Sequence, residues 1–162
     1  MDSNSIGRIA TSCARQGYKP LYGISGNTAQ PNILADPNLD GTVVGHHTWA
    51  WPAADTPGRQ EFHDVFARYA PNQATNGSHA VGWSAAKAFE LAAAGVGPQP
   101  TSGEILAGLW AFRDDDLGGV TYPLTFTRGK PASPRACWSL VIVKKQRWTA
   151  PYGGGMECAG GA

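Results

Sequence analysis

The chain has 162 residues, of which 42% are hydrophobic and six are tryptophan, which suits one domain or a large piece of a bigger one. Lys and Arg number 13 and Asp and Glu number 12, for a net charge of +1, which argues against the basic stripe that nucleic-acid binding needs. No apolar run approaches the ~18 residues of a membrane-spanning helix. The opening residues also lack the basic and apolar regions of a secretory signal.

The first third of the sequence predicts one helix and two extended segments. The helix begins after a cap at Asp2 or Ser3 and ends at Gly17, which suits the left-handed conformation that closes many helices. Residues 20–24 and 42–49 predict strands, separated by a polar loop and a region rich in turn residues. The apolar positions of the helix recur at spacings of three and four residues: Ile6, Ile9, Ala10, Cys13 and Ala14.

Three further helices are predicted in the middle of the chain. The first has Thr56 as its cap and Pro57 as its first residue, and Pro71 and the Asn-Gly pair at 76–77 break it. The second covers roughly residues 78–94, and its many alanines permit close packing against a neighbour. The third begins at the capping box formed by Thr101 and Glu104 and carries Trp110 on its apolar face.

The last quarter of the chain predicts strands. Residues 120–122 and 124–127 alternate in the manner of strands, and residues 137–143 form the most apolar predicted strand, which a polar turn follows. The tail 151–162 is rich in glycine and is expected to be flexible. A parallel α/β sheet needs a strand before each crossover helix, and the first helix has none. This order indicates a fragment or an unusual strand pairing.

The sequence contains no pattern that predicts an enzyme. It lacks the G-x-S-x-G nucleophile elbow, the phosphate-binding loop and the dinucleotide-binding fingerprint. The adjacent His46 and His47 would point to opposite faces of a strand, so they do not make one metal site. The acidic run 114–116 lacks the spacing of a calcium loop. We therefore expect no catalytic site, no metal and no cofactor.

The three cysteines leave the redox compartment open. An odd count leaves one thiol unpaired in a secreted protein, whereas three scattered cysteines are unremarkable in a cytosolic one. Cys13 lies on the apolar stripe of the first helix and is expected to be buried as a small hydrophobic residue. We hypothesise that Cys137 and Cys158 pair, because a loop of about 20 residues is easily closed.

Segments in order along about residues 5–150 resemble the second half of the type I periplasmic solute-binding proteins of ABC importers, of the branched-chain-amino-acid and leucine-binding type. The resemblance rests on the order and spacing of the segments more than on any single motif. In one of them Trp83 stands where the family commonly has tyrosine. The matching segments are 8–18, 21–26, 40–45, 57–71, 80–88, 101–109, 118–126 and 141–148.

The resemblance implies an α/β protein with a partial periplasmic-binding-protein-like I fold. Such a protein is a two-lobed α/β sandwich with parallel sheets, and this chain would lack most of the first lobe, because it resembles the C-terminal half alone. Residues 1–46 would form part of the second lobe, 47–134 would contribute to the first, and 135–150 would return to the second. Residues 151–162 would be the flexible tail.

The resemblance also implies a function without chemistry. The full-length protein would capture a small polar solute, such as an amino acid, an amide or a urea-like molecule, by closing two lobes about a hinge. It would deliver the solute to an ABC permease from the periplasm or the cell surface, with no nucleic-acid partner and no membrane span of its own. The alternative is a ligand-sensing regulatory domain on the same scaffold.

Ligand contacts are carried over from the family to particular positions of this sequence. Members that bind amino acids carry a carboxylate in the cleft loop, whereas this chain has Ser25 there and no acid nearby. A neutral hydroxyl suits an amide, urea or sugar-like group better than a buried ammonium. The implied ligand-binding residues are Ser25, Gly26 and Asn27 in the cleft loop, Ser3 and Asn4 at the helix start, Ser78 as a first-lobe contact and Trp83 near the hinge.

Overall fold

The computed structural model describes residues 2–131 and 135–159. Four α-helices span Ser3–Arg15 (α1), Pro57–Tyr69 (α2), Gly77–Ala93 (α3) and Ser102–Leu109 (α4). Five strands span Gly23–Ser25 (β1), Val43–His46 (β2), Cys137–Lys144 (β3), Arg147–Thr149 (β4) and Glu157–Cys158 (β5). Three short 3-10 helices span Gly26–Thr28 (η1), Pro31–Ala35 (η2) and Pro37–Leu39 (η3).

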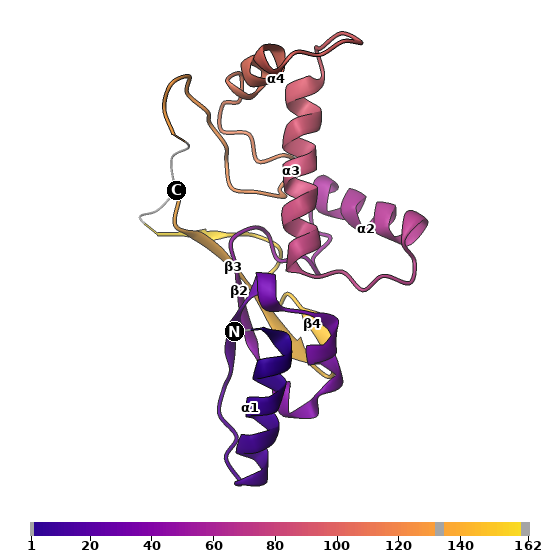
Figure 1. Cartoon of the computed structure of the whole chain (residues 1–162), viewed down its shortest axis with the longest axis vertical. Coiled ribbons are helices and arrows are strands. Elements are labelled where there is room, and N and C mark those ends of the chain that lie inside the picture. The colour runs from indigo at the N-terminus through magenta and orange to yellow at the C-terminus, as the bar shows by residue number, and fades with distance from the viewer. Residues whose placement is uncertain (1, 132–134, 160–162) are drawn as a thin grey trace.

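The chain is arranged as two bodies joined near the middle of the molecule (Figure 1). The lower one, which we call the sheet body, contains α1, the three 3-10 helices and the sheet. The upper one, the helical body, contains α2, α3 and α4 with the loops around them. The N-terminal ends of α1 and α3 both lie near the level where the bodies meet.

The sheet is mixed rather than parallel throughout. Its order is β1-β2-β3-β4, with β5 paired to the start of β3. β1 and β2 are parallel, with Gly23 opposite Val43, while the pairs β2–β3, β3–β4 and β3–β5 are antiparallel. The antiparallel pairs arise because β3 enters the sheet from the helical body, and β4 follows it after a turn at Lys145 and Gln146.

Helix α1 forms where the sequence predicts it. The Asp2 side chain accepts hydrogen bonds from the Asn4 and Ser5 amides at 2.9 Å each, so it caps the helix. Gly17 has a φ of 73°, the left-handed conformation expected after the last turn. Ile6 and Ala10 are the buried residues of the helix, and they face η2 and η3.

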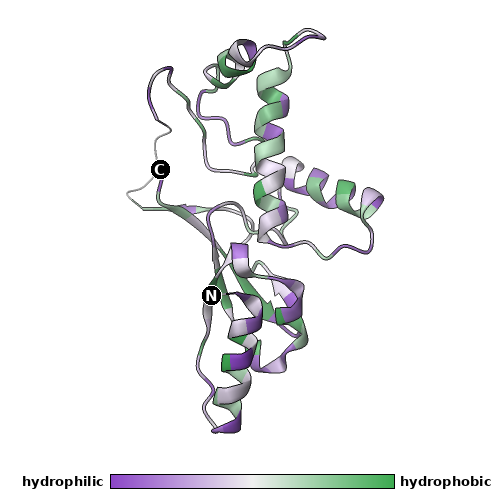
Figure 2. Ribbon diagram, in the orientation of Figure 1, coloured by the Kyte–Doolittle hydropathy of each residue, from purple (hydrophilic) through white to green (hydrophobic). Residues whose placement is uncertain are grey.

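Two hydrophobic cores hold the molecule. The smaller lies under α1 in the sheet body and contains Ile6, Ala10, Tyr22, Ile33, Leu39 and Val143. The larger lies where the bodies meet and extends into the helical body, where Figure 2 shows α3 as mostly apolar. The larger core contains Ala29, Val44, Trp49, Ala50, Trp51, Phe62, Ala80, Ala92, Phe112, Leu117, Val120 and Val141.

The predicted strands at 120–122 and 124–127 are wrong. These residues form an irregular segment, and an isolated bridge between Asp115 and Leu124 is the only strand-like pairing described there. The segment turns sharply, since Leu117, Gly118 and Gly119 have positive φ values of 56°, 73° and 90°. Val120 is nonetheless fully buried. The alternating pattern therefore reports packing against the core, not pairing with a neighbouring strand.

The C-terminal region is fastened to the rest of the molecule along its described part, which differs from the expected flexible tail. Cys137 and Cys158 form a disulfide, which confirms the hypothesised pairing, and Cys13 is a free, half-buried cysteine. The β5 strand that contains Cys158 pairs with β3. Residues 160–162, which the same expectation covered, lie outside the described residues.

Candidate functional site

The candidate site begins at the loop that follows β1. The strand ends at Ser25 and the chain continues directly into η1, where the Thr28 hydroxyl donates a hydrogen bond of 2.8 Å to the Ser25 carbonyl. Gly26 is buried, while Ser25 and Asn27 are exposed. The turn thus presents two neutral polar side chains to solvent at the carboxyl end of the strand, which is where open α/β sheets bind ligands.

The N-terminus of α3 packs directly against this loop. A Cβ placed on Gly77 would lie 2.6 Å from the Gly26 carbonyl oxygen, so the two backbones meet without room for a side chain. Asn76 donates from Nδ2 to Oε1 of Gln30 at 3.1 Å. Ser78, the next residue of the helix, is exposed. The loop from the sheet body and the helix start from the helical body therefore meet in one place.

Asn76 caps α3 in an arrangement with His79. The side-chain Oδ1 of Asn76 accepts a hydrogen bond from the backbone amide of His79 at 3.2 Å, and the backbone amide of Asn76 donates to Nδ1 of His79 at 3.2 Å. The cap is a neutral amide. The first-turn N–H groups of Gly77 and Ser78 have no intrahelical acceptor, as in any α-helix, and they carry the positive end of the helix dipole.

His46 fills the space between the loop and α3. Its ring is 2% exposed and lies 2.9 Å, at Cε1, from where a Cβ on Gly77 would be. Neither ring nitrogen makes a hydrogen bond to any described residue. Burial, reinforced by the neighbouring His47, lowers the pKa of His46 from 6.5 to about 4. The ring is therefore neutral at physiological pH and serves as packing at the junction.

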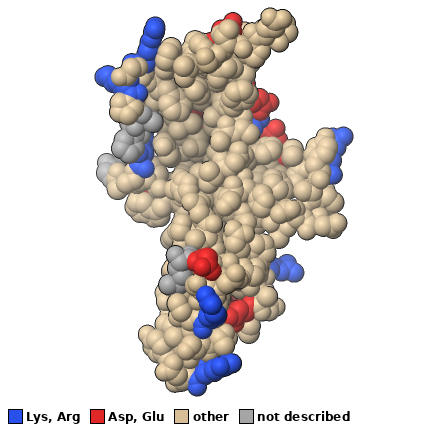
Figure 3. Space-filling view, in the orientation of Figure 1, with Lys and Arg blue, Asp and Glu red and all other residues tan. Residues whose placement is uncertain are grey.

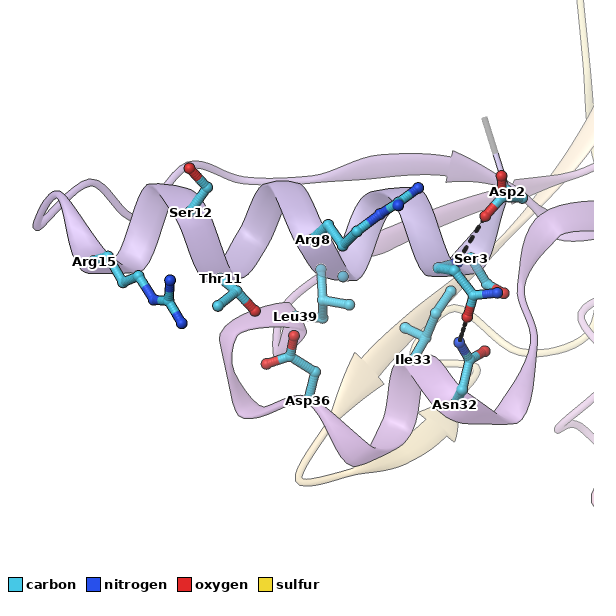
Figure 4. Close-up of a pocket in the computed structure, with 12 residues that line it drawn as sticks. Asp2, Ser3, Arg8, Thr11, Ser12, Arg15, Asn32, Ile33, Asp36 and Leu39 are labelled. Atoms are coloured by element: carbon cyan, nitrogen blue, oxygen red, sulfur yellow. Dashed lines mark hydrogen bonds between the residues drawn. The ribbon is translucent and has the colours of Figure 1, made fainter.

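A separate cavity of about 820 Å³ runs along α1 (Figure 4). Ser3 and Asn4 line one end of it, where Asn4 Oδ1 accepts a hydrogen bond of 3.0 Å from Nδ2 of Asn32. Asp36 lies across the cavity from α1, nearest to Thr11 among the labelled residues of the helix. This cavity is open and polar at its rim, and buried Ile33 and Leu39 lie at its floor.

The residues implied by the family resemblance thus fall into three places. The structure brings Ser25, Gly26 and Asn27 together with the α3 start that carries Ser78. Ser3 and Asn4 lie in the α1 cavity, which does not include the β1 loop. Trp83 packs edge-on against Phe62, with ring centroids 5.7 Å apart, in the larger core.

Sequence reasoning missed three residues of the junction. Asn76 was interpreted as a helix breaker, although an asparagine just before a helical run is also a cap signal. His46 was considered as a metal ligand, but its inward position on β2 makes it a packing residue. Gln30 carried no signal, since its partner lies 46 residues away in sequence.

The surface around the junction carries few charges on the face shown in Figure 3, and Lys and Arg lie mainly toward the edges of the molecule. Among the residues that the structure describes, no group of three or more His, Cys, Asp or Glu could hold a metal ion. Within the same residues, no helix has both the length and the apolar character needed to cross a bilayer.

A loop at the carboxyl end of a strand, at the junction of two bodies, is a position where α/β proteins commonly bind ligands. The sequence matches the family described as periplasmic binding protein over residues 1–147. The chain belongs to this family. Among curated protein sequences, none matches it.

Three solved structures share the fold. A leucine-binding protein from Thermotoga maritima superposes with a TM-score of 0.69 at 15% identity, over 95% of this chain and 43% of that one. A valine-bound branched-chain amino acid ABC transporter protein from Thermus thermophilus superposes with a TM-score of 0.65 at 14% identity, over 92% of this chain and 42% of that one. A fatty acid ABC transporter substrate-binding protein from Thermomonospora curvata superposes with a TM-score of 0.65 at 19% identity, over 98% of this chain and 40% of that one. The chain spans about two fifths of the length of these proteins.

Proposed function

We propose that this chain is part of an extracytoplasmic solute-binding component of an ABC importer. In this proposal residues 1–46 and 135–150 belong to the second lobe and 47–134 to the first. The lobes close about the hinge between them onto a small polar solute, and the closed protein delivers the solute to a permease. A solute that contacts both lobes stabilises only the closed state with its full binding energy.

The contact between the β1 loop and the start of α3 carries this proposal. It joins the two bodies through Gly26 and Gly77, and the exposed residues Ser25, Asn27 and Ser78 are the sequence neighbours of these two glycines. Hydroxyl and amide groups, together with the free N–H groups of the first turn of α3, suit the oxygen of a carbonyl, carboxylate, amide or urea. No carboxylate stands in the loop, so a neutral solute or the acidic end of a larger one fits better than an ammonium group.

The disulfide supports a location outside the cytoplasm. Cys137 and Cys158 are paired, and structural disulfides form and persist in oxidising compartments such as the periplasm or the cell surface. The similar solved proteins are a leucine-binding protein and ABC transporter proteins for branched-chain amino acids and for fatty acids. The solute of the present protein is therefore to be sought by experiment among amino acids, amides, urea and fatty acids.

Calorimetry on a longer chain that contains both lobes tests the proposed site. Calorimetry against these candidate solutes first identifies the one that binds. Ser25→Ala is then expected to weaken its binding about fivefold, because one hydrogen bond contributes about 1 kcal/mol. Ser102→Ala, an equally small change at the exposed start of α4, should leave affinity unchanged. In the present chain alone, Ser25→Ala is expected to have little effect. Unchanged affinity for Ser25→Ala in the longer chain would contradict the assignment of the loop.

A further inference from the structure

Two stretches of chain pass between the two bodies, and a third begins and ends in the sheet and contacts both of them. The first leads from the end of β2 at His46 to the start of α2 at Pro57, and the second ends at Cys137, where β3 begins. The third leaves the end of β4 at Thr149 and runs to β5. We call residues 150–159 the strap. Its contacts reach both of the other stretches.

The strap is fixed to the first stretch at Gly154. The Gly154 amide donates to Oδ2 of Asp55 at 2.9 Å, and its carbonyl accepts from the Ala50 amide at 3.2 Å. The Gly154 bond and Arg59 together hold the pKa of Asp55 below its usual range. A side chain at position 154 has no room, because its Cβ would lie 2.5 Å from Nη1 of Arg59.

Arg59 ties this contact to the helical body. It is 6% exposed, forms an ion pair of 2.6 Å with Asp55, and donates from Nε to the Gly119 carbonyl at 2.7 Å. The Asp55 bond is charge-assisted and the guanidinium of Arg59 is buried, which strengthens both polar contacts. The strap is thereby attached to the base of α2 and to the loop that precedes Val120.

The strap is fixed to the second stretch at β5. Residues 157 and 158 pair with Trp138 and Cys137 of β3, and the Cys137–Cys158 disulfide closes the pair covalently. The Ala159 amide adds a hydrogen bond of 2.9 Å to the Ala136 carbonyl. The two cysteines of the disulfide are 21 residues apart in sequence. The disulfide therefore restricts a segment that would otherwise be free to leave the sheet.

We propose that the strap cross-links the three stretches into one unit and so limits the rotation of the helical body against the sheet body. The disulfide holds β5 in place, and β5 holds Gly154 against Asp55. Because the energy gap between open and closed states sets the apparent affinity of a hinged binding protein, the strap also tunes solute binding; this last consequence rests on the proposed function.

Hydrogen exchange on the chain as it stands tests the proposal. In the double variant Cys137→Ala, Cys158→Ala, the Gly154, Ala50 and Ala159 amides are expected to exchange at least tenfold faster. The His79 amide, which bonds Asn76 at the junction, should also exchange faster, because the bodies move more freely. Amides of α1 should keep their rates. The matched control is Cys13→Ala, which removes the free thiol and should change none of the junction amides.

A second arm avoids the substitutions. Dithiothreitol transfers two electrons to the native disulfide, which gives two cysteine thiols and cyclic oxidised dithiothreitol, and the same amides are then measured. Wild-type rates at Ala50, Gly154 and His79 after either treatment would overturn the proposal. So would equal acceleration throughout α1 and α4, since that reports general unfolding. No solute enters either measurement, so a failure here is distinct from a failure of the proposed function.

Discussion

The two cores of the molecule differ in what they join. The core under α1 is made by segments that are close in sequence, except for Val143 of β3. The larger core gathers Val44 and Val141 from the sheet together with Phe62 of α2, Ala80 of α3 and Phe112 after α4. One core therefore stabilises a body, while the other stabilises the contact between two bodies.

Strand β3 shows how one chain segment serves both cores. Its buried residues alternate along the strand, and Val141 belongs to the larger core while Val143 belongs to the smaller. Ile24 and Trp148 pack against both cores. The helical body is thus attached to the sheet by shared apolar packing as well as by the stretches of chain that connect the bodies. Loss of the larger core should therefore loosen both bodies, whereas loss of the smaller should act mainly on α1.

Phe62→Ala is expected to give the largest loss of stability. Phe62 is fully buried and contacts the rings of Trp49, Phe66 and Trp83. Its removal leaves a cavity at the junction and should lower the free energy of unfolding by about 3–5 kcal/mol, measured by denaturant titration. Phe89→Ala on α3 is the matched control, because that ring is 60% exposed and its loss should cost under about 1 kcal/mol. Similar losses for both variants would contradict the described core.

Acid is expected to weaken the junction through His46. The pKa of this ring is lowered from 6.5 to about 4 by burial and by His47. Between these two pH values His46 is protonated in the unfolded chain and neutral in the folded one. The stability that the neutral His46 ring contributes is fully present above pH 6.5. About 3 kcal/mol of the free energy of unfolding is lost as the pH falls from 6.5 to about 4.

The contribution of His46 is separated from other titrations by substitution. His46→Gln should remove this part of the difference in unfolding free energy between pH 7 and pH 4.5. His47→Gln, at the adjacent exposed position, should retain most of it. An unchanged pH dependence in the His46 variant would show that the ring is hydrated or paired in solution.

Local signals in the sequence predicted most of the helices and the main strand. The cap at Asp2, the left-handed Gly17 and the capping box at Thr101 are each fixed by residues within four positions of one another, so the sequence alone indicates them. The apolar run of β3 was equally readable. The family resemblance supplied the fold class, because order and spacing of segments survive where single motifs do not.

The rest depends on contacts between distant residues. The irregular segment around Val120 has an alternating pattern, but within the described residues its only pairing is the isolated bridge of Leu124 to Asp115. Sequence periodicity does not report whether a partner strand exists. The Gln30–Asn76 hydrogen bond and the Asp55–Gly154 bond join residues 46 and 99 positions apart. The glycine-rich composition of the tail predicted flexibility, whereas long-range contacts such as those of Gly154 and Cys158 hold its described part in place.

Two glycines of α3 distinguish the junction from the free face of the same helix. A Cβ on Gly77 would lie 2.6 Å from the Gly26 carbonyl, whereas a Cβ on Gly82 would meet nothing within 4 Å. Gly77→Ala should therefore cost about 2 kcal/mol through overpacking against backbone. Gly82→Ala should stabilise the protein by up to about 1 kcal/mol, because alanine is the better helix former. Thermal denaturation checks both signs, and a neutral Gly77→Ala would contradict the contact between the bodies.

The smallest expected effect lies far from the junction, at the start of α4. Thr101 accepts a hydrogen bond from the Glu104 amide, and the Glu104 carboxylate accepts from the Thr101 amide at 2.8 Å, which also keeps the pKa of Glu104 below its usual value. Thr101→Ala should cost about 1 kcal/mol, and exchange should accelerate in α4 alone. Ser102→Ala, one residue on, should be neutral. Faster exchange at the Asn76 cap of α3 as well would mean that the far end of the helical body is coupled to the junction. It would contradict the expectation that the start of α4 opens independently of the larger core.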